Sequence, residues 1–381
     1  MAYDFSFVPD RYNTGSIKWT DDYKNCFPFS VADMEWRTAP AIRKSLSDFA
    51  QNGFYCYTAP DEKYRSVVCD FMKRRHNWEI SPEWLVCTYG IVSAIHTTVK
   101  TYTKEGEGVI IQPPVYHHFA QAVTLNNRLL VNNPLVINNG RYEMNFDELE
   151  SLCRDKNNKM LILCSPHNPV GRVWTKEELT KVAEICYENS VLLVSDEIHF
   201  DITKNEHTVL TSIDKKYNEN TIICTAASKS FNIAGLGTSN IIIADEKLRN
   251  AFEQMLEIDG YGCINAFSYP ALMSAYTQCD EWLDEMNSHI QSNFRILADF
   301  VKEYMPKAFL SPLEGTYLAW LDVSFLGIED EKLVDFFAEK TGIVPSAGYV
   351  FGEEGKGFIR LDIAVPESVL SEALERIKAV L

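Results

Sequence analysis

One lysine in the middle of the chain stands where lysine is not expected. Lys229 lies in the stretch SKSFN (228–232), shortly after the apolar run from Ile222 to Cys224. Burial at the end of a strand lowers the pKa of an amine, and a neutral amine is a nucleophile that reacts with aldehydes. A lysine in a loop after a strand is also common, so Lys229 alone does not decide between chemistry and chance.

Three further apolar runs are each followed by a residue able to hold a ligand. The runs are Val109 to Ile111, followed by Tyr116; Met160 to Cys164, followed by Asn168; and Val191 to Val194, followed by Asp196. In an open parallel sheet, ligands bind beyond the carboxyl ends of the strands. We therefore expect an aromatic ring, an amide, an acid and the lysine to meet at one edge of a sheet.

Each of these residue types suits one part of pyridoxal phosphate (PLP), an aldehyde cofactor. Lys229 provides the amine that the aldehyde needs, and a buried carboxylate such as Asp196 keeps the pyridine nitrogen protonated. Asn168 can donate a hydrogen bond to the phenolic oxygen, and Tyr116 offers a face to the flat ring. A phosphate prefers a helix N-terminus, which the stretch TYGIVSA (88–94) would supply. Together these residues predict a PLP site.

Each residue also has a structural explanation when it is taken alone. Asp196 can cap a helix or a turn, Asn168 before a proline is an ordinary turn signal, and Tyr116 can be core packing. His199 alone is better explained as a hydrogen-bonded structural histidine than as a base. Only the joint occurrence of these residues, in this order along the chain, favours a cofactor site.

The elements that position these residues can be predicted from the same runs. Short continuous apolar segments, including Ile241 to Ala244, alternate with amphipathic helices, which is typical of an α/β fold with a mostly parallel sheet covered on both faces. One helix begins at a capping box formed by Thr175 and Glu178 and ends at Asn189. Its buried stripe comprises Leu179, Val182, Ala183 and Cys186.

After about residue 275 the pattern changes to that of a second, smaller α+β domain. The expected elements are a helix over roughly 280–304, a strand over 316–321, a helix around 330–340, a strand over 358–363 and a closing helix. The closing helix places Val369, Leu370, Ala373, Leu374, Ile377 and Leu381 on one face. The N-terminal segment is expected to pack here, which gives a large domain over 45–275 and a small domain built from 1–44 and 276–381.

The composition excludes several classes of partner. The chain has 381 residues and a formal net charge of −17, which argues against nucleic acid or an anionic membrane. The first residues lack the basic start and apolar core of a signal peptide, and no apolar run approaches the length of a membrane span, so we expect a cytoplasmic protein. The ten cysteines include no C-x-x-C pair, and the histidines lack a second ligand pair at metal spacing, so no metal is expected.

Several longer stretches are similar to a known family. SDEIHFD (195–201) and SKSFNIAGL (228–236) are together highly specific, and VADMEW (31–36) and YCYTAP (55–60) narrow the match. Further matching stretches are DRYNTGSIKW (10–19), RRHNWEISPEW (74–84), EGTYLAW (314–320) and FIRLDIA (358–364). Over nearly its whole length the chain resembles the fold-type-I PLP enzymes of the class I/II aminotransferase superfamily, and among them the MalY/PatB-type cystathionine β-lyases.

The resemblance implies a fold and a role for each residue. The fold is a large domain with a mostly parallel seven-stranded sheet flanked by helices, plus the smaller α+β domain, assembled as a homodimer. Lys229 would bind PLP covalently and move the Cα proton, and Arg360 would hold the substrate carboxylate through a bidentate contact. Tyr57 would reach from the partner subunit toward the phosphate and the substrate. Asp196, Asn168, Tyr116 and His199 would contact the cofactor, Asn168 also the substrate, and Gly90, Ile91 and Ser228 would help to anchor the phosphate.

Three positions depart from the broader aminotransferase pattern. His199 stands three residues after the aspartate, where many aminotransferases have a tyrosine, as in the lyase-like branch. Ala226 stands where a serine is frequent, and Gly237 stands where a basic residue is frequent, so we expect a less cationic phosphate site. His117 follows the stacking tyrosine on the side where a leaving group could lie, and its role is open.

The implied activity is a carbon–sulfur β-lyase that converts cystathionine or cysteine S-conjugates to a thiol, pyruvate and ammonia. A PLP-dependent aminotransferase of class I/II is an alternative, because the two reactions share every residue named above. A regulatory or binding protein that retains PLP with low turnover is a second alternative, although intact Lys229, Asp196 and Arg360 count against it.

Overall fold

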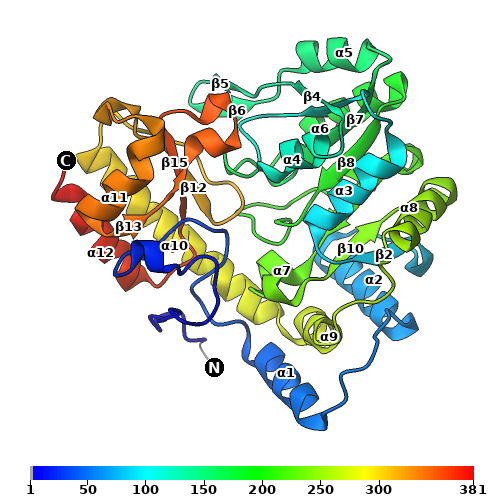
Figure 1. The fold of residues 1–381 in the computed structure, drawn as a ribbon, viewed down its shortest axis with the longest axis horizontal. Helices are drawn as coiled ribbons and strands as arrows, with labels where there is room; N and C mark the ends of the chain where they lie inside the picture. Colours follow the sequence, from blue (N-terminus) through cyan, green and yellow to red (C-terminus); the bar gives the residue numbers. More distant parts are fainter. Residues whose placement is uncertain (1–2) are drawn as a thin grey trace.

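A seven-stranded sheet forms the centre of the larger part of the molecule in the computed structural model, which describes residues 3–381 (Figure 1). The order across the sheet is β2 (Leu85–Thr88), β10 (Ser239–Ile242), β9 (Thr221–Thr225), β8 (Leu192–Asp196), β7 (Asn158–Cys164), β3 (Gly108–Ile111) and β4 (Leu129–Asn132). The pairs from β9 to β4 are parallel, and β10 is antiparallel to both of its neighbours. The expected mostly parallel sheet is confirmed.

Alternate residues of the central strands face opposite sides of this sheet, which explains why the strands are apolar throughout. In β7, Met160, Ile162 and Cys164 belong to a core shared with one set of helices, and Leu161 and Leu163 belong to a core shared with another. The first set is α3 (Ile91–Tyr102), α4 (His118–Thr124) and α8 (Glu246–Ile258), and the second includes α2 (Glu62–His76), α5 (Phe146–Arg154) and α6 (Lys176–Asn189).

Helix α6 begins and ends as its sequence predicts. The Thr175 hydroxyl accepts a hydrogen bond from the backbone N–H of Glu178 at 3.2 Å, and the Glu178 carboxylate accepts one from the N–H of Thr175 at 2.8 Å. The helix ends at Asn189, and Ser190 follows in the left-handed region with φ 61°. All four residues of the predicted stripe are buried.

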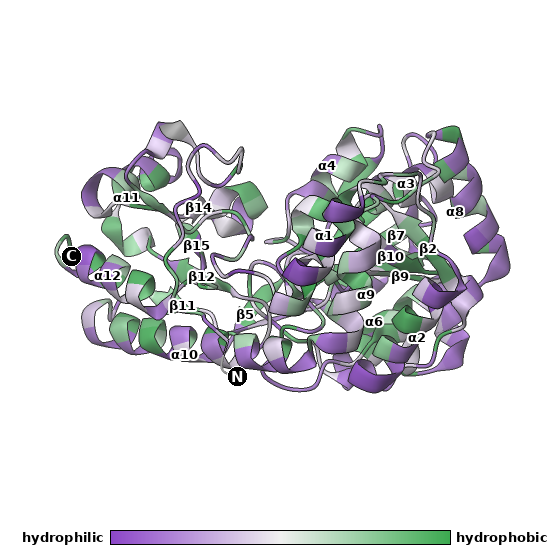
Figure 2. Ribbon diagram, turned by 90° about the horizontal axis from the view of Figure 1, so that it is seen from below, coloured by the Kyte–Doolittle hydropathy of each residue, from purple (hydrophilic) through white to green (hydrophobic). Residues whose placement is uncertain are grey.

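A four-stranded antiparallel sheet forms the second part of the molecule. Its order is β11 (Phe309–Leu310), β12 (Leu318–Asp322), β15 (Phe358–Asp362) and β14 (Ser346–Ala347), and the helices α10 (Asp280–Tyr304), α11 (Leu333–Thr341) and α12 (Glu367–Lys378) accompany it. Figure 2 shows this sheet at the opposite end of the molecule from the large sheet, with α10 along one side. The expected helix over 280–304 is confirmed at both ends.

Two expectations for this part were wrong in detail. The strand expected to begin at residue 316 begins at Leu318, because Thr316 has a φ of 67°, which an extended strand does not allow. Leu381 was expected on the buried face of the last helix, but that helix ends at Lys378, and Leu381 is 48% exposed.

The N-terminal segment contacts both parts of the chain. Strand β1 (Phe27–Pro28) pairs in parallel with β13 (Ile343–Val344), as expected for a segment that packs on the smaller domain. Helix α1 (Pro40–Asn52) packs against α9 (Ser268–Gln278). The expected domain boundaries, 44/45 and 275/276, both fall inside these two helices, and a division at those residues stays a prediction.

No helix within residues 3–381 is long and apolar enough to cross a membrane. The expected cytoplasmic location stays a prediction.

Candidate active site

Three adjacent strands bring the predicted lysine, acid and amide to one edge of the large sheet. Cys164 of β7, Asp196 of β8 and Cys224 of β9 are in register across the sheet. Asn168 follows β7 by four residues, and Lys229 lies in the short helix α7 (Ala227–Ser230) directly after β9. The convergence expected from the order of the strands therefore follows from their parallel pairing.

Asp196 is a buried carboxylate without a cationic partner. Its side chain is 3% exposed by residue area, accepts a hydrogen bond from the backbone N–H of Ile198 at 3.1 Å, and forms no ion pair with any residue in the range 3–381. Burial raises the pKa of this carboxyl to about 7. Burying an unpaired charge is costly, so a cation placed beside Asp196 would be bound strongly.

The Lys229 amine contacts the N-terminal segment. Its Nζ donates a hydrogen bond to the carbonyl oxygen of Ala32 at 2.7 Å. Burial lowers the pKa of the amine, and the Asp33 carboxylate acts in the opposite direction. A lowered pKa leaves more of the neutral, nucleophilic form at physiological pH.

Arg360 on β15 is a buried cation whose hydrogen bonds go to neutral groups. Its Nη1 donates to Oδ1 of Asn168 at 3.0 Å, and its Nη2 donates to the carbonyl of Ser30 at 2.8 Å and the hydroxyl of Ser346 at 3.3 Å. Its Nε has no hydrogen-bond partner within the described chain. Burial lowers the pKa of Arg360 to about 10, which leaves the guanidinium charged at neutral pH. A buried guanidinium with donors to spare is a site for a carboxylate.

This contact also orients the Asn168 amide. Because arginine only donates hydrogen bonds, the group of Asn168 that faces Arg360 is the amide oxygen, and the amide nitrogen is turned elsewhere. The backbone carbonyl of Asn168 accepts from the N–H of Tyr116 at 3.1 Å, which joins the amide to the predicted stacking residue. The amide nitrogen of Asn168 is thus left as a donor, and its expected role toward a ring oxygen stays a prediction.

Tyr116 and His199 lie in the same region as the acid and the lysine. Burial raises the pKa of the Tyr116 phenol to about 12, and the neighbouring Asp196 adds to this rise. His199 is buried, and burial together with the charges of Lys229 and Arg360 lowers its pKa far below the usual value. Its imidazole is therefore neutral, and its Nδ1 has no hydrogen-bond partner among residues 3–381.

The expected phosphate residues lie at helix starts. Gly90 is the N-cap of α3 with φ 84°, Ile91 is the first residue of that helix, and Ser228 lies in α7. Gly237, which stands where a basic residue is frequent, has φ 55°, and a Cβ there would lie 2.6 Å from the Tyr89 ring. A side chain at Gly237 would need a positive φ and would have to displace the exposed Tyr89 ring.

Tyr57 is not brought to the site within this chain. Its side chain is 97% exposed, and the next residue, Thr58, pairs with Ile264 in an isolated bridge. An exposed tyrosine is compatible with a reach into a partner subunit, and that role stays a prediction.

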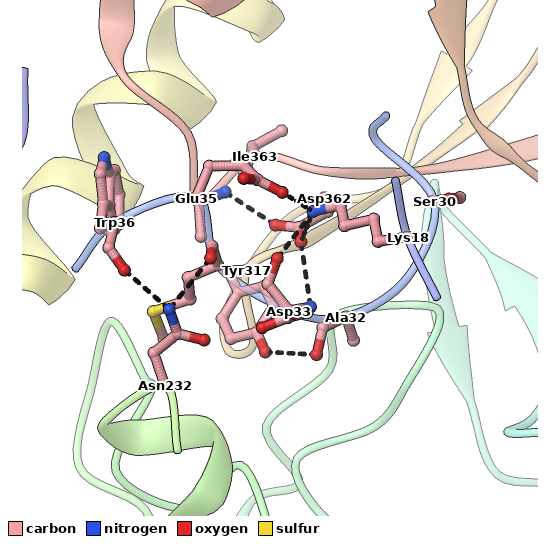
Figure 3. A network of polar contacts seen from close by, with 12 residues as sticks. Lys18, Ser30, Ala32, Asp33, Glu35, Trp36, Asn232, Tyr317, Asp362 and Ile363 are labelled. Atoms are coloured by element: carbon pink, nitrogen blue, oxygen red, sulfur yellow. Dashed lines mark hydrogen bonds and ion pairs between the residues drawn. The ribbon is translucent and has the colours of Figure 1, made fainter. Parts of the chain in front are cut away.

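Several residues that contact the site carry no assigned role from the sequence. Figure 3 shows that Tyr317 and the segment around Ala32 meet at a buried polar network. The Tyr317 hydroxyl donates to the carbonyl of Ala32 at 3.0 Å, the same carbonyl that Lys229 contacts from 197 residues away. Any residue type supplies a backbone carbonyl, so spacing could not reveal this contact. Only the matched stretches VADMEW and EGTYLAW pointed to the region.

The residues present fit PLP on three independent observations. Asp196 is a buried carboxylate that lacks a cation, Lys229 supplies an amine at the same sheet edge, and the Asn168 amide nitrogen is turned away from Arg360 as a donor. The chemistry of this set matches a protonated pyridine nitrogen, an aldehyde and a phenolic oxygen.

Comparisons with known proteins agree with this geometry. The family model for aminotransferase class I and II matches residues 24–377. Cystathionine beta-lyase PatB of Bacillus subtilis is 37% identical, covering 99% of this chain and 100% of its own length, and Protein MalY of Escherichia coli is 29% identical, covering 98% and 97%. Cystalysin from Treponema denticola, solved with a pyridoxal 5'-phosphate cofactor, has a TM-score of 0.96 at 40% identity and covers 100% of this chain and 98% of its own.

Proposed function

This chain belongs to the class I and II aminotransferase family and is a PLP-dependent carbon–sulfur lyase, and we propose that it acts on cystathionine and on cysteine S-conjugates. The observation that carries the proposal is the placement of the Lys229 amine near a buried acid, Asp196, and a buried guanidinium, Arg360, neither of which has an ion-pair partner in residues 3–381. This set can hold a cofactor on one side of the amine and an amino acid on the other.

When bound, PLP supplies an aldehyde carbon that combines with amines and a ring that accepts the electron pair left at the substrate Cα. Asp196 would hold a proton on the ring nitrogen, and the Asn168 amide would donate to the ring oxygen. Tyr116 would lie against the ring, and Gly90 and Ile91 would turn backbone N–H groups toward the phosphate.

The substrate is held and deprotonated by two residues. Arg360 would bind the α-carboxylate through its unused donors, which places Cα within reach of the Lys229 amine. In its neutral form, Lys229 takes the proton from Cα. The bond from Cβ to sulfur then breaks, sulfur leaves as a thiolate, and one water is consumed as the remaining three-carbon unit becomes pyruvate and ammonia.

A cavity of about 220 Å³ lies beside Tyr116 and offers room for the group on sulfur. Its wall includes His117 and residues 349–354, and one of these, Phe351, has its ring 4.8 Å from the Arg360 guanidinium carbon. We place the sulfur substituent of the substrate in this cavity because Tyr116, proposed to stack on the ring, lines it, and Phe351 in its wall contacts Arg360, proposed to bind the carboxylate. Burial lowers the pKa of His117 to about 4, so the histidine in this wall is neutral.

The charge of the cavity favours a cationic substituent. Glu354 is half-buried in its wall and forms no ion pair with any residue of the described chain, whereas Glu353 is exposed and paired with Lys356. The residues that line the cavity, all within the described range, include no lysine or arginine. A distal ammonium, such as that of cystathionine, would be attracted, and a lone distal carboxylate would be repelled.

We also propose that the chain works as a homodimer. Phe54, Tyr55 and Tyr57 are 76%, 61% and 97% exposed along one short segment. Three exposed aromatic side chains in one short segment indicate a surface that a second copy of the chain covers. In that assembly Tyr57 would reach the site of the partner.

An assay with L-cystathionine tests the proposal against its alternatives. The purified protein loaded with PLP is expected to release pyruvate and a thiol without any keto-acid acceptor. A product that forms only when a keto acid is added would identify an aminotransferase. PLP binding without either product would identify a protein that keeps the cofactor for another purpose.

A further inference from the structure

Backbone carbonyls of residues 30–36 hold both cationic residues of the site. The carbonyl of Ser30 accepts from Nη2 of Arg360 at 2.8 Å, and two residues later the carbonyl of Ala32 accepts from Nζ of Lys229 at 2.7 Å. One short segment of main chain therefore contacts the proposed carboxylate binder and the proposed base.

The next two alternate carbonyls contact the chain just beyond the lysine. The amide nitrogen of Asn232 donates to the carbonyls of Met34 at 3.0 Å and Trp36 at 2.7 Å. Asn232 follows Lys229 by three residues, so the segment and the lysine-bearing turn are fixed to each other at two points. The position of the Ala32 carbonyl relative to the lysine backbone is thereby set.

A buried ion cluster fixes the same segment to the small sheet (Figure 3). Nζ of Lys18 lies 2.9 Å from the Asp362 carboxylate and 3.0 Å from that of Glu35, and it donates to the carbonyl of Asp33 at 2.7 Å. All three charged side chains are fully buried. Asp362 lies two residues after Arg360 on β15. The ion cluster therefore links residues 30–36 to the strand that carries Arg360.

The Ala32 carbonyl has a second donor. The hydroxyl of Tyr317, a fully buried side chain immediately before β12, donates to it at 3.0 Å. A carbonyl oxygen has two lone pairs, and here one serves the tyrosine and the other serves the amine. The Tyr317 hydroxyl makes no other hydrogen bond within residues 3–381, although its ring also contacts His199.

We propose that the Ala32 carbonyl is the docking point of the Lys229 amine whenever the amine is free, and that Tyr317 is a positioning residue that tunes this acceptor. The proposal rests on the proposed role of Lys229 as the base. By donating to the oxygen, Tyr317 withdraws electron density from it, so the oxygen stabilises an ammonium less strongly. The amine accordingly gives up its proton more readily than it would beside an unshared carbonyl.

The Tyr317→Phe variant removes only the hydroxyl and keeps the ring. The pKa of Lys229 is expected to rise by roughly 0.5 unit or more, because hydrogen bonds to charged groups are strong enough to shift a pKa by that amount. Tyr276→Phe is a matched control, because the Tyr276 hydroxyl is also buried and bonds neither to Lys229 nor to the carbonyls of residues 30–36. The control is expected to leave the pKa of Lys229 unchanged.

The pKa can be measured without any turnover. The full chain, freed of PLP by dialysis, is treated with an amine-acylating reagent over a range of pH, and the modified peptide that contains Lys229 is quantified by mass spectrometry. A higher midpoint pH in Tyr317→Phe than in the wild type and the control supports the proposal. Equal midpoints in all three proteins overturn it. This result is independent of whether pyruvate forms, so it separates the present proposal from the proposed activity.

Kinetics of the loaded enzyme give a second measurement. In Tyr317→Phe, the acid limb of the kcat–pH profile is expected to shift to higher pH. KM is expected to stay near the wild-type value, because Arg360 contacts Ser30 and not Ala32. A rise in KM with an unmoved acid limb would show that Tyr317 serves packing alone. Thermal unfolding of each variant checks that the fold is retained.

Discussion

Arg360 of the small sheet donates at 3.0 Å to the amide oxygen of Asn168, which lies in the loop after β7 of the large sheet, although 192 residues separate them. The contact links the proposed carboxylate binder to the proposed partner of the cofactor ring. If the two residues have these roles, we expect a carboxylate bound at Arg360 to act also on the Asn168 amide. One hydrogen bond would then couple amino-acid binding to the cofactor ring.

Arg360→Lys is expected to raise KM for the amino-acid substrate by roughly 10- to 100-fold, because a lysine cannot make the bidentate contact and a charge-assisted hydrogen bond is lost. PLP should stay bound, since Arg360 is not among the residues proposed to hold it. Steady-state kinetics and the visible absorbance of the cofactor check the two statements. An unchanged KM would remove Arg360 from the carboxylate role.

Asp196→Asn is expected to change how stability depends on pH in the PLP-free protein. Burial raises the pKa of the Asp196 carboxyl from its ordinary value to about 7 in the folded chain. The folded state therefore holds this proton more tightly than the unfolded state, and the contribution of Asp196 to stability declines as the pH rises from about 4 through about 7. The slope for one such group is at most about 1.4 kcal/mol per pH unit.

The asparagine variant lacks this slope because it does not titrate. Urea unfolding of both PLP-free proteins at several pH values isolates the difference, and parallel stability curves would contradict the buried, unpaired state of Asp196. With PLP bound, the stability of the wild type should no longer decline between about pH 4 and pH 7 through Asp196, because the cationic ring nitrogen would stabilise the ionised carboxylate.

Lys18→Met is expected to destabilise the fold by about 3–5 kcal/mol, because it leaves Asp362 buried without a counter-charge and leaves Glu35 with only the 3.4 Å contact to Arg11. Lys44→Met is the matched control, since Lys44 pairs with Asp48 on the surface, where both side chains are more than half exposed. The control should unfold at nearly the wild-type denaturant concentration. Similar losses in the two variants would show that the buried cluster does not hold the 30–36 segment.

The sheet was largely predictable because its strands are buried on both faces. The runs that become β3, β7, β8 and β9 are apolar throughout. Because these strands are parallel, the residues that follow them lie at one edge of the sheet. The edge strand β4 was missed, since Leu129, Leu130 and Asn132 are exposed and its sequence has no continuous core pattern. The Ala32 carbonyl and the Lys18 cluster were missed because main-chain acceptors and pairs 344 residues apart leave no periodic signal.

Glu354→Gln is expected to change which cysteine conjugates the enzyme prefers. The wild type should cleave S-(2-aminoethyl)-L-cysteine more efficiently than S-(carboxymethyl)-L-cysteine, and the variant should reduce this preference by roughly 5-fold, as expected for one partly buried charge. Glu329→Gln is the matched control, because it removes the same charge from an exposed side chain that is paired with Lys332 and does not line the cavity. If both variants keep the wild-type preference, the sulfur substituent does not occupy this cavity.

Mixing two inactive variants tests the shared site. Lys229→Ala lacks the base, and Tyr57→Ala lacks the residue proposed to come from the partner, so each homodimer is expected to show little pyruvate formation. In a mixed dimer, one of the two sites combines an intact Lys229 from one chain with an intact Tyr57 from the other. Subunit exchange should therefore restore activity to a substantial fraction of that of wild-type sites. If Tyr57 served the site of its own chain, no mixed site would contain both residues, and activity would stay at the level of the separate variants.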